Sequence, residues 1–345
     1  MRALIIGGTG NISTAIAAQL IGRGDQVVLY NRGQTRPQFE GEYQVIAGDR
    51  TDHARFEEQV RQAGIFDCAI DMIGYEPEDA HSAVRACRGR VGRFVFCSTV
   101  DVYTKPATAY PVREDAERSP APAFAYAYKK AQLERILEAA QEAGDFPLTI
   151  IRPAATYNDS SAPIPLVGKD TLVLQRLRRG LPLILLGDGT SLWVSCHRDD
   201  VARAFVAALD NPAAAGRFYH VTGEQWMTWE DYYQTAARVL GVEARFARIP
   251  TELLVRMAPA AAEWCGINFC FNNLFDNAAA KADLGFRYTI TWEEGVRRMV
   301  AYHDAQGAID RCPPEPLYER IVEAWGKLSA AVPDLEQGGA GPARP

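Results

Sequence analysis

The chain has 345 residues, of which 48% are hydrophobic and 23% are charged. This size and composition fit a globular protein with ample material for a core, divided into two domains or one domain with an appendage. The net charge of −6 argues against a nucleic-acid partner, because the phosphate backbone favours a basic protein surface.

The first 150 residues alternate short apolar runs with amphipathic segments. The apolar runs predict strands over residues 3–6, 26–30, 44–46, 68–71, 94–97 and 148–151. The amphipathic segments predict helices over residues 12–23, 54–62, 77–87 and 126–143. Because the strands are too apolar to face water on either side, this alternation predicts an α/β fold with a doubly wound parallel sheet.

A glycine-rich segment, Gly7–Gly10, joins the first strand to the first helix. Gly7 and Gly10 permit a tight turn that brings the backbone close to a pyrophosphate, and the helix that starts at Asn11 and Ile12 directs free N–H groups at it. Its place in a strand–turn–helix unit makes this a specific signal for a Rossmann dinucleotide site. Ser13 occupies the third glycine position, and we expect its hydroxymethyl group to shift the helix slightly outward.

The second strand ends at Asn31 and Arg32, where an NAD site usually carries an acidic residue for the ribose hydroxyls. A 2′-phosphate repels a carboxylate and favours arginine, so this pair favours NADP as the cofactor. The alternative is NAD, with Arg32 stacked on the adenine. Asp49 and Arg50 follow the third strand and complete the predicted cofactor site, with Asp49 as an acceptor for the adenine amino group.

Beyond Arg152-Pro153 the pattern changes to longer loops and helices, predicted over residues 171–179, 199–208, 228–240, 251–257, 291–302 and 317–330. We therefore expect a dinucleotide-binding Rossmann domain over residues 1–155. A smaller, mostly helical substrate-binding lobe is expected at the carboxyl edge of the sheet over residues 156–330, with the chain crossing back to the core. Residues 331–345, rich in glycine and proline, predict a disordered tail.

Five motifs occur in a recognisable order: Gly7–Gly10, Ser98–Tyr103, Tyr126–Lys130 with Glu134, Arg152-Pro153 and Asp200–Ala202. Together they resemble the extended short-chain dehydrogenase/reductase family, the NAD-dependent epimerase/dehydratase group, of which the chain looks like a divergent member. The resemblance spans about residues 1–305, and the order and spacing of the motifs carry it.

The resemblance implies a catalytic set of Tyr126, Lys130 and Thr99, with Asp101 as a further member that acts as a base or orients its loop. Tyr126 and Lys130 lie one helical turn apart and so project from the same face. The ammonium and the positive charge of the nicotinamide are expected to lower the pKa of Tyr126, so that its phenolate can take a hydroxyl proton. By the family pattern, Thr99 binds the same substrate oxygen and Lys130 also holds the nicotinamide ribose.

The substrate side departs from the family pattern. Trp193 stands where many nucleotide-sugar enzymes place an arginine that grips the diphosphate, and an indole cannot form that charge-assisted pair. Val100 replaces one of the two carboxylates of the dehydratases, which disfavours elimination of water. Tyr157, Asn158 and Trp193 are the predicted substrate-binding residues, although Trp193 is equally compatible with core packing.

These features predict an NAD(P)-dependent oxidoreductase or epimerase that acts by hydride transfer at a secondary alcohol. The expected partner is a small molecule: a sugar, a nucleotide sugar or a cyclitol. The alternative is a non-catalytic dinucleotide-sensing or RNA-binding protein, because the Asn31–Gly33 segment also resembles the chloroplast stem-loop RNA-binding subgroup. Retention of Tyr126, Lys130 and Thr99 favours the enzyme.

Seven scattered cysteines without a C-x-x-C pair indicate free thiols, and hence a cytoplasmic protein, and offer no metal site. The apolar run before Gly7 is too short for a signal peptide, and no run is long enough to cross a membrane. The family resemblance also allows a homodimer formed through the helix over residues 126–143.

Overall fold

The structure, a computed structural model, describes residues 1–332, so most of the predicted tail lies outside the described residues. The described chain forms two compact units that interleave along the sequence. Unit 1 comprises Met1–Ser161, Leu192–Met227 and Phe271–Met299, and unit 2 comprises the described residues of the segments between and after these.

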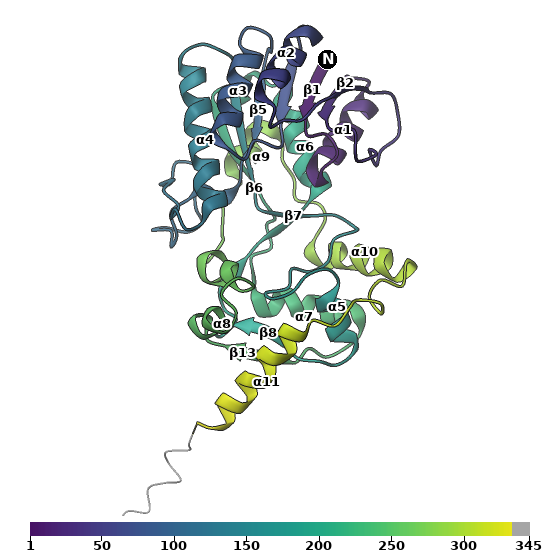
Figure 1. The fold of residues 1–345 in the computed structure, drawn as a ribbon, viewed down its shortest axis with the longest axis vertical. Coiled ribbons are helices and arrows are strands. Elements are labelled where there is room, and N and C mark those ends of the chain that lie inside the picture. The colour runs from purple at the N-terminus through teal and green to yellow at the C-terminus, as the bar shows by residue number, and fades with distance from the viewer. Residues whose placement is uncertain (333–345) are drawn as a thin grey trace, which may run out of the picture. The chain divides into compact units, whose positions relative to one another are not determined.

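Unit 1 is built on a seven-stranded parallel sheet with the order β11-β6-β5-β4-β1-β2-β3 (Figure 1). Its strands are β1(Arg2–Ile6), β2(Gln26–Asn31), β3(Gln44–Ala47), β4(Cys68–Asp71), β5(Phe94–Cys97), β6(Leu148–Pro153) and β11(Arg217–Val221). The predicted doubly wound parallel sheet is confirmed, and β11 is a strand that the sequence pattern did not reveal. The strand order reverses between β1 and β4, where such sheets bind their ligands at the carboxyl ends.

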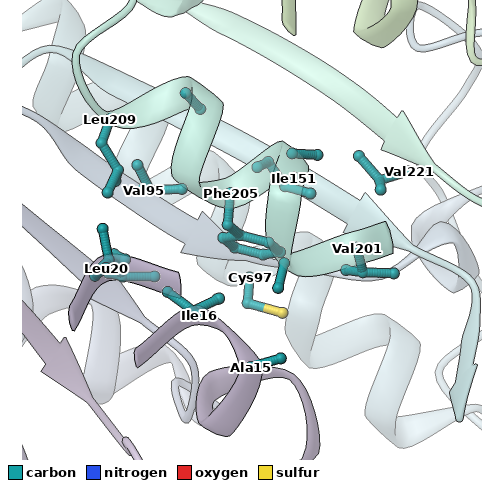
Figure 2. Close-up of a cluster of buried hydrophobic side chains, with 14 of the residues drawn as sticks. Ala15, Ile16, Leu20, Val95, Cys97, Ile151, Val201, Phe205, Leu209 and Val221 are labelled. Carbon is teal, nitrogen blue, oxygen red and sulfur yellow. The ribbon is translucent and has the colours of Figure 1, made fainter. Parts of the chain in front are cut away.

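Helices cover both faces of this sheet. In unit 1 they are α1(Asn11–Arg23), α2(His53–Ala63), α3(Pro77–Cys87), α4(Ala125–Glu142), α6(Arg198–Leu209), α9(Ala278–Leu284) and the first part of α10(Trp292–Ala305), with short helices at Val100–Val102 and Pro212–Ala214. Apolar side chains of α1 and α6 meet over β5 and β6, where Phe205 lies among Leu20, Val95 and Ile151 (Figure 2). A second core layer joins α2, α3 and α4 to the opposite face.

Two pairs of short strands, which the sequence pattern also did not reveal, form separate two-stranded sheets. They are β7(Ala155–Tyr157) with β10(Ser195–His197), and β9(Leu192–Trp193) with β12(Met227–Thr228). Unit 2 contains α5(Leu172–Arg178), α7(Trp229–Leu240), α8(Thr251–Met257), a π-helix over Cys265–Phe269, α11(Pro316–Ala330), and the parallel strands β8(Leu183–Leu186) and β13(Phe246–Ile249). Its core includes Trp229, whose indole N–H donates to the carbonyl of Phe269 at 3.0 Å. Among residues 1–332, no helix is long and apolar enough to cross a membrane.

Candidate active site

The glycine-rich turn after β1 is sterically confined. Gly7 has a φ of +90°, and a Cβ atom there would lie 2.4 Å from Cγ2 of Ile73. A Cβ atom on Gly8 would lie 2.5 Å from Cδ2 of Leu29. The backbone conformation of Gly7 therefore requires glycine, and an added Cβ atom at either position would have to displace a neighbouring side chain.

Ser13 has a specific use in this turn. Its hydroxyl accepts a hydrogen bond from the Gly10 N–H at 2.8 Å, and its side chain is buried. The group that we expected to push α1 outward thus caps the first turn of the helix. The first turn of α1 carries no acidic residue, which leaves its positive end available to an anion.

Two cavities open on this turn, one of about 260 Å³ and one of about 560 Å³. They share the lining residues Gly7, Gly10, Ile73 and Tyr75, so they adjoin across the glycine-rich turn. The smaller cavity is also lined by Asn11, Ile12, Thr99, Tyr126 and Lys130, and the larger by Asn31, Arg32, Asp49 and Arg50. The structure thus gathers the predicted cofactor residues around two adjoining cavities.

In the larger cavity, the three residues that could select the cofactor differ in how they are held. The Asn31 side chain accepts the Gly33 N–H at 2.8 Å, and two hydrogen bonds from Thr51 keep the pKa of Asp49 below its ordinary value. Arg32 is exposed, and no hydrogen bond or ion pair within residues 1–332 engages its guanidinium. Of these three residues, Arg32 is therefore the one that can offer a positive charge to a ligand.

Arg50 lines the same cavity but is largely engaged by the protein. Its guanidinium donates to the carbonyl of Asp79, lies 3.6 Å from a carboxylate oxygen of Asp71, and stacks 4.0 Å above the ring of Phe56. These contacts bury it and brace Asp71 at the carboxyl end of β4. Cofactor binding by Arg50 stays a prediction.

In the smaller cavity, Tyr126 and Thr99 line the same wall region with Lys130. The pKa of Tyr126 is raised by the partial removal of its hydroxyl from water and by the Asp101 carboxylate, and these effects outweigh the opposing effect of the neighbouring Thr99 hydroxyl. The lowering of this pKa that we expected from Lys130 is therefore not produced by the chain's own groups. Any lowering must come from a positive charge bound beside the tyrosine.

Lys130 is buried, and its ammonium donates to the carbonyl of Cys97 at 2.8 Å. The Nζ atom lies 4.7 Å from the ring centroid of Phe96 and 4.9 Å from that of Tyr75. Burial lowers the pKa of Lys130, while the two rings attract its charged form. Tyr75 lines both cavities and was not singled out in the sequence, because nothing in its local pattern indicates that it reaches Lys130.

The three predicted substrate-binding residues, Asn158, Tyr157 and Trp193, lie in two different surroundings. Asn158 donates to the Asn11 side chain at 2.7 Å, and Asn11 donates to the Thr156 carbonyl at 2.9 Å, which ties β7 to the start of α1. Tyr157 and Trp193 are each 6% exposed and are absent from the residues lining the two cavities. Their roles in substrate binding stay predictions that the packing of unit 1 does not favour.

A buried charged network lies behind the smaller cavity. Arg152 and Glu134 are both fully buried, and the guanidinium donates twice to the carboxylate at 2.8 Å. Glu134 also accepts from Arg118 at 2.6 Å. Burial by itself raises the pKa of Glu134, but the positive charge of Arg152 lowers it and contributes to a net lowering. The pair is therefore ionic.

The chain is similar to known proteins over most of its length. Residues 3–222 match the model of the NAD dependent epimerase/dehydratase family. A 2′-dehydrokanamycin reductase from Streptomyces kanamyceticus is 28% identical over 252 residues, which cover 73% of this chain and 70% of that protein. The chloroplast stem-loop binding protein of 41 kDa b from Arabidopsis thaliana is 25% identical over 253 residues, covering 70% and 63%.

Among solved structures, the UDP-glucose 4-epimerase of Thermotoga maritima, crystallised with UDP-glucose, superposes with a TM-score of 0.70. It is 19% identical, and the match covers 89% of this chain and 99% of that one. At this identity the likeness establishes a shared fold.

Proposed function

Since this chain belongs to the NAD dependent epimerase/dehydratase family, we propose that it reduces a ketone of a sugar-like substrate to a secondary alcohol, reversibly, with a nicotinamide dinucleotide. The observation that carries the proposal is the meeting of Thr99, Tyr126 and Lys130 around one cavity that adjoins the glycine-rich turn. A hydroxyl pair and a buried ammonium beside a dinucleotide site are the groups that hydride transfer at a carbonyl requires.

In this mechanism Tyr126 is the general acid. Its hydroxyl protonates the carbonyl oxygen as the carbon is reduced, and in the reverse direction its phenolate takes the proton of the alcohol. Thr99 holds the same oxygen by a hydrogen bond, and Lys130 holds the cofactor ribose with its ammonium. When bound beside these residues, a nicotinamide dinucleotide would supply the hydride for reduction and take it up in oxidation. The raised pKa of Tyr126 favours its protonated form, and hence reduction, at neutral pH.

We further propose that the substrate lacks a diphosphate. At the place where nucleotide-sugar enzymes carry an arginine, this chain has the buried Trp193, which offers no charge to a phosphate. A reductase acting on an oxidised aminoglycoside is among the similar proteins, which supports a sugar or cyclitol ring as the substrate class.

Absorbance at 340 nm tests the function directly. The purified chain is mixed with NADP⁺ or NAD⁺ and, in turn, kanamycin, myo-inositol or UDP-glucose. We expect net formation of reduced cofactor with a free aminoglycoside or cyclitol, and little with UDP-glucose. Conversion of UDP-glucose to its 4-epimer without a change in absorbance would show an epimerase and overturn the proposal of a net reductase.

We propose NADP as the preferred cofactor, with Arg32 as the ligand of the 2′-phosphate. Arg32→Gln is expected to lower kcat/KM for NADPH by roughly ten- to a hundredfold, because a hydrogen bond to a charged group contributes about 1.5–3 kcal/mol. The value for NADH should stay within about twofold. Arg36→Gln is the matched control, since Arg36 is equally exposed but does not line the larger cavity. Equal losses with both cofactors would contradict the assignment.

A further inference from the structure

The Asp101 carboxylate connects the predicted catalytic pair to a lysine outside it. One carboxylate oxygen, Oδ2, accepts the Thr99 hydroxyl at 3.3 Å, and the other, Oδ1, accepts the ammonium of Lys105 at 3.0 Å. The side chains of Asp101 and Lys105 are 13% and 12% exposed, so water screens the pair only weakly. Lys105 also donates to the side chain of the buried Asn273 at 2.8 Å, which fixes the ammonium from its other side.

The hydrogen bonds of Thr99 show how Asp101 affects the availability of the Thr99 hydroxyl to a substrate. A hydroxyl has one proton and two acceptor sites. In the structure the proton of Thr99 is directed at Asp101, and one acceptor site takes the Asp101 N–H at 3.2 Å. Thr99 and Tyr126 line the same cavity, where a substrate oxygen would need the Thr99 proton. For Thr99 to donate to a substrate oxygen its proton must leave Asp101, so the carboxylate and the substrate compete for it.

Asp101 also acts on Tyr126 through its charge. Besides burial, the groups that raise the pKa of Tyr126 are Asp101, Cys97 and Tyr75, while the Thr99 hydroxyl lowers it. Lys130, on the same helix as Tyr126, is directed at the Cys97 carbonyl. The Lys105 ammonium, paired with Asp101 at 3.0 Å, offsets part of the charge of this carboxylate.

We propose that Lys105 is a positioning residue that, by pairing with Asp101, weakens the hold of this carboxylate on the Thr99 proton and leaves Thr99 and Tyr126 available to the substrate oxygen. The inference rests on the proposed function. It assigns Asp101 a structural and electrostatic task, since one of its carboxylate oxygens is engaged by the Lys105 ammonium and the other by the Thr99 hydroxyl.

The test is the pH profile of kcat/KM for alcohol oxidation with NADP⁺, using whichever of kanamycin, myo-inositol and UDP-glucose the wild type oxidises fastest. The ascending limb of this profile follows formation of the Tyr126 phenolate. In Lys105→Met the carboxylate is no longer balanced, so the limb should move to higher pH by on the order of one unit. In Asp101→Asn the negative charge is removed, so the limb should move to lower pH. Lys105→Arg should restore the wild-type profile.

Two further variants separate positioning from a general effect of charge. In Asp101→Asn the added change Lys105→Met should have little effect, because its route to Tyr126 is gone. Lys129→Met removes an exposed ammonium that pairs with Glu76, and it should leave the profile unmoved. If Lys105→Met fails to fold, Asn273→Leu loosens the same ammonium and should move the limb in the same direction by less.

The outcomes are distinguishable. A wild type that oxidises none of the three alcohols overturns the proposed function, and this inference with it. An active wild type whose profile is unchanged in Lys105→Met overturns the inference alone. An equal shift on adding Lys105→Met to the wild type and to Asp101→Asn would show that Lys105 acts directly on Tyr126, which also contradicts it.

Discussion

The variant Tyr126→Phe is expected to lower kcat for ketone reduction by roughly 10²- to 10⁴-fold, the range that general acid–base catalysis contributes. The change removes only the hydroxyl and keeps the ring that lines the smaller cavity. Cofactor affinity, measured by the fluorescence of bound NADPH, should therefore change by less than about threefold. A loss in kcat without a loss in cofactor binding is the expected signature of a proton donor.

The chain offers a matched control for this experiment. Tyr128 lies on the same helix, is 37% exposed against 36% for Tyr126, and does not line the smaller cavity. Tyr128→Phe should keep kcat within about twofold of the wild type. Equal activity of the two variants would remove Tyr126 from the mechanism and favour a binding protein of the same fold.

The second large effect concerns stability. Arg152→Met is expected to lower the free energy of unfolding by about 3–5 kcal/mol, because it leaves the buried Glu134 without its bidentate partner. Tyr103 loses a partner as well, since its hydroxyl accepts from Arg152 at 2.6 Å. Urea unfolding followed by circular dichroism measures the loss.

A surface ion pair gives the reference value for this loss. Arg85 bonds Glu57 and Glu78 on α2 and α3, and its side chain is 47% exposed. Arg85→Met should cost less than about 1 kcal/mol, because exposed pairs contribute little. The double variant Glu134→Leu, Arg152→Met should recover part of the loss, since both buried charges are gone. If Arg152→Met is no less stable than Arg85→Met, the buried pair does not stabilise the fold.

Much of unit 1 could be predicted from the sequence. Its first six strands are mostly apolar, and four of them are followed by a helical pattern, so periodicity alone indicates them. β11 was missed because Arg217 and His220 interrupt its apolar run, and it forms a strand only by pairing with β6. Its His220 is buried, where burial lowers the pKa of the imidazole to about 3, so only the fold shows that this position is internal.

The candidate site likewise contains residues that the sequence could predict and contacts that it could not. Thr99, Tyr126 and Lys130 follow from motif order, and they line one cavity. The hydrogen bond from Lys105 to Asn273 joins residues that are 168 positions apart in the sequence, so no local sequence pattern indicates it. Likewise, the side chain that caps α6 is His197, while Asp200 accepts the N–H groups of Thr289 and Ile290. Long-range pairs of this kind depend on the tertiary fold.

The interleaving of the two units bears on how the chain is synthesised. β6 ends at Pro153, but its partner β11 is not complete until Val221, and α6, which covers one face of the sheet, comes between them. At about 5–20 residues per second, a ribosome needs on the order of several seconds to span that interval. During this time the nascent chain carries an unpaired strand edge and an uncovered apolar face, both of which favour aggregation. The sheet can therefore close only late in translation, and a fragment ending at Ser161 would stay in that unprotected state.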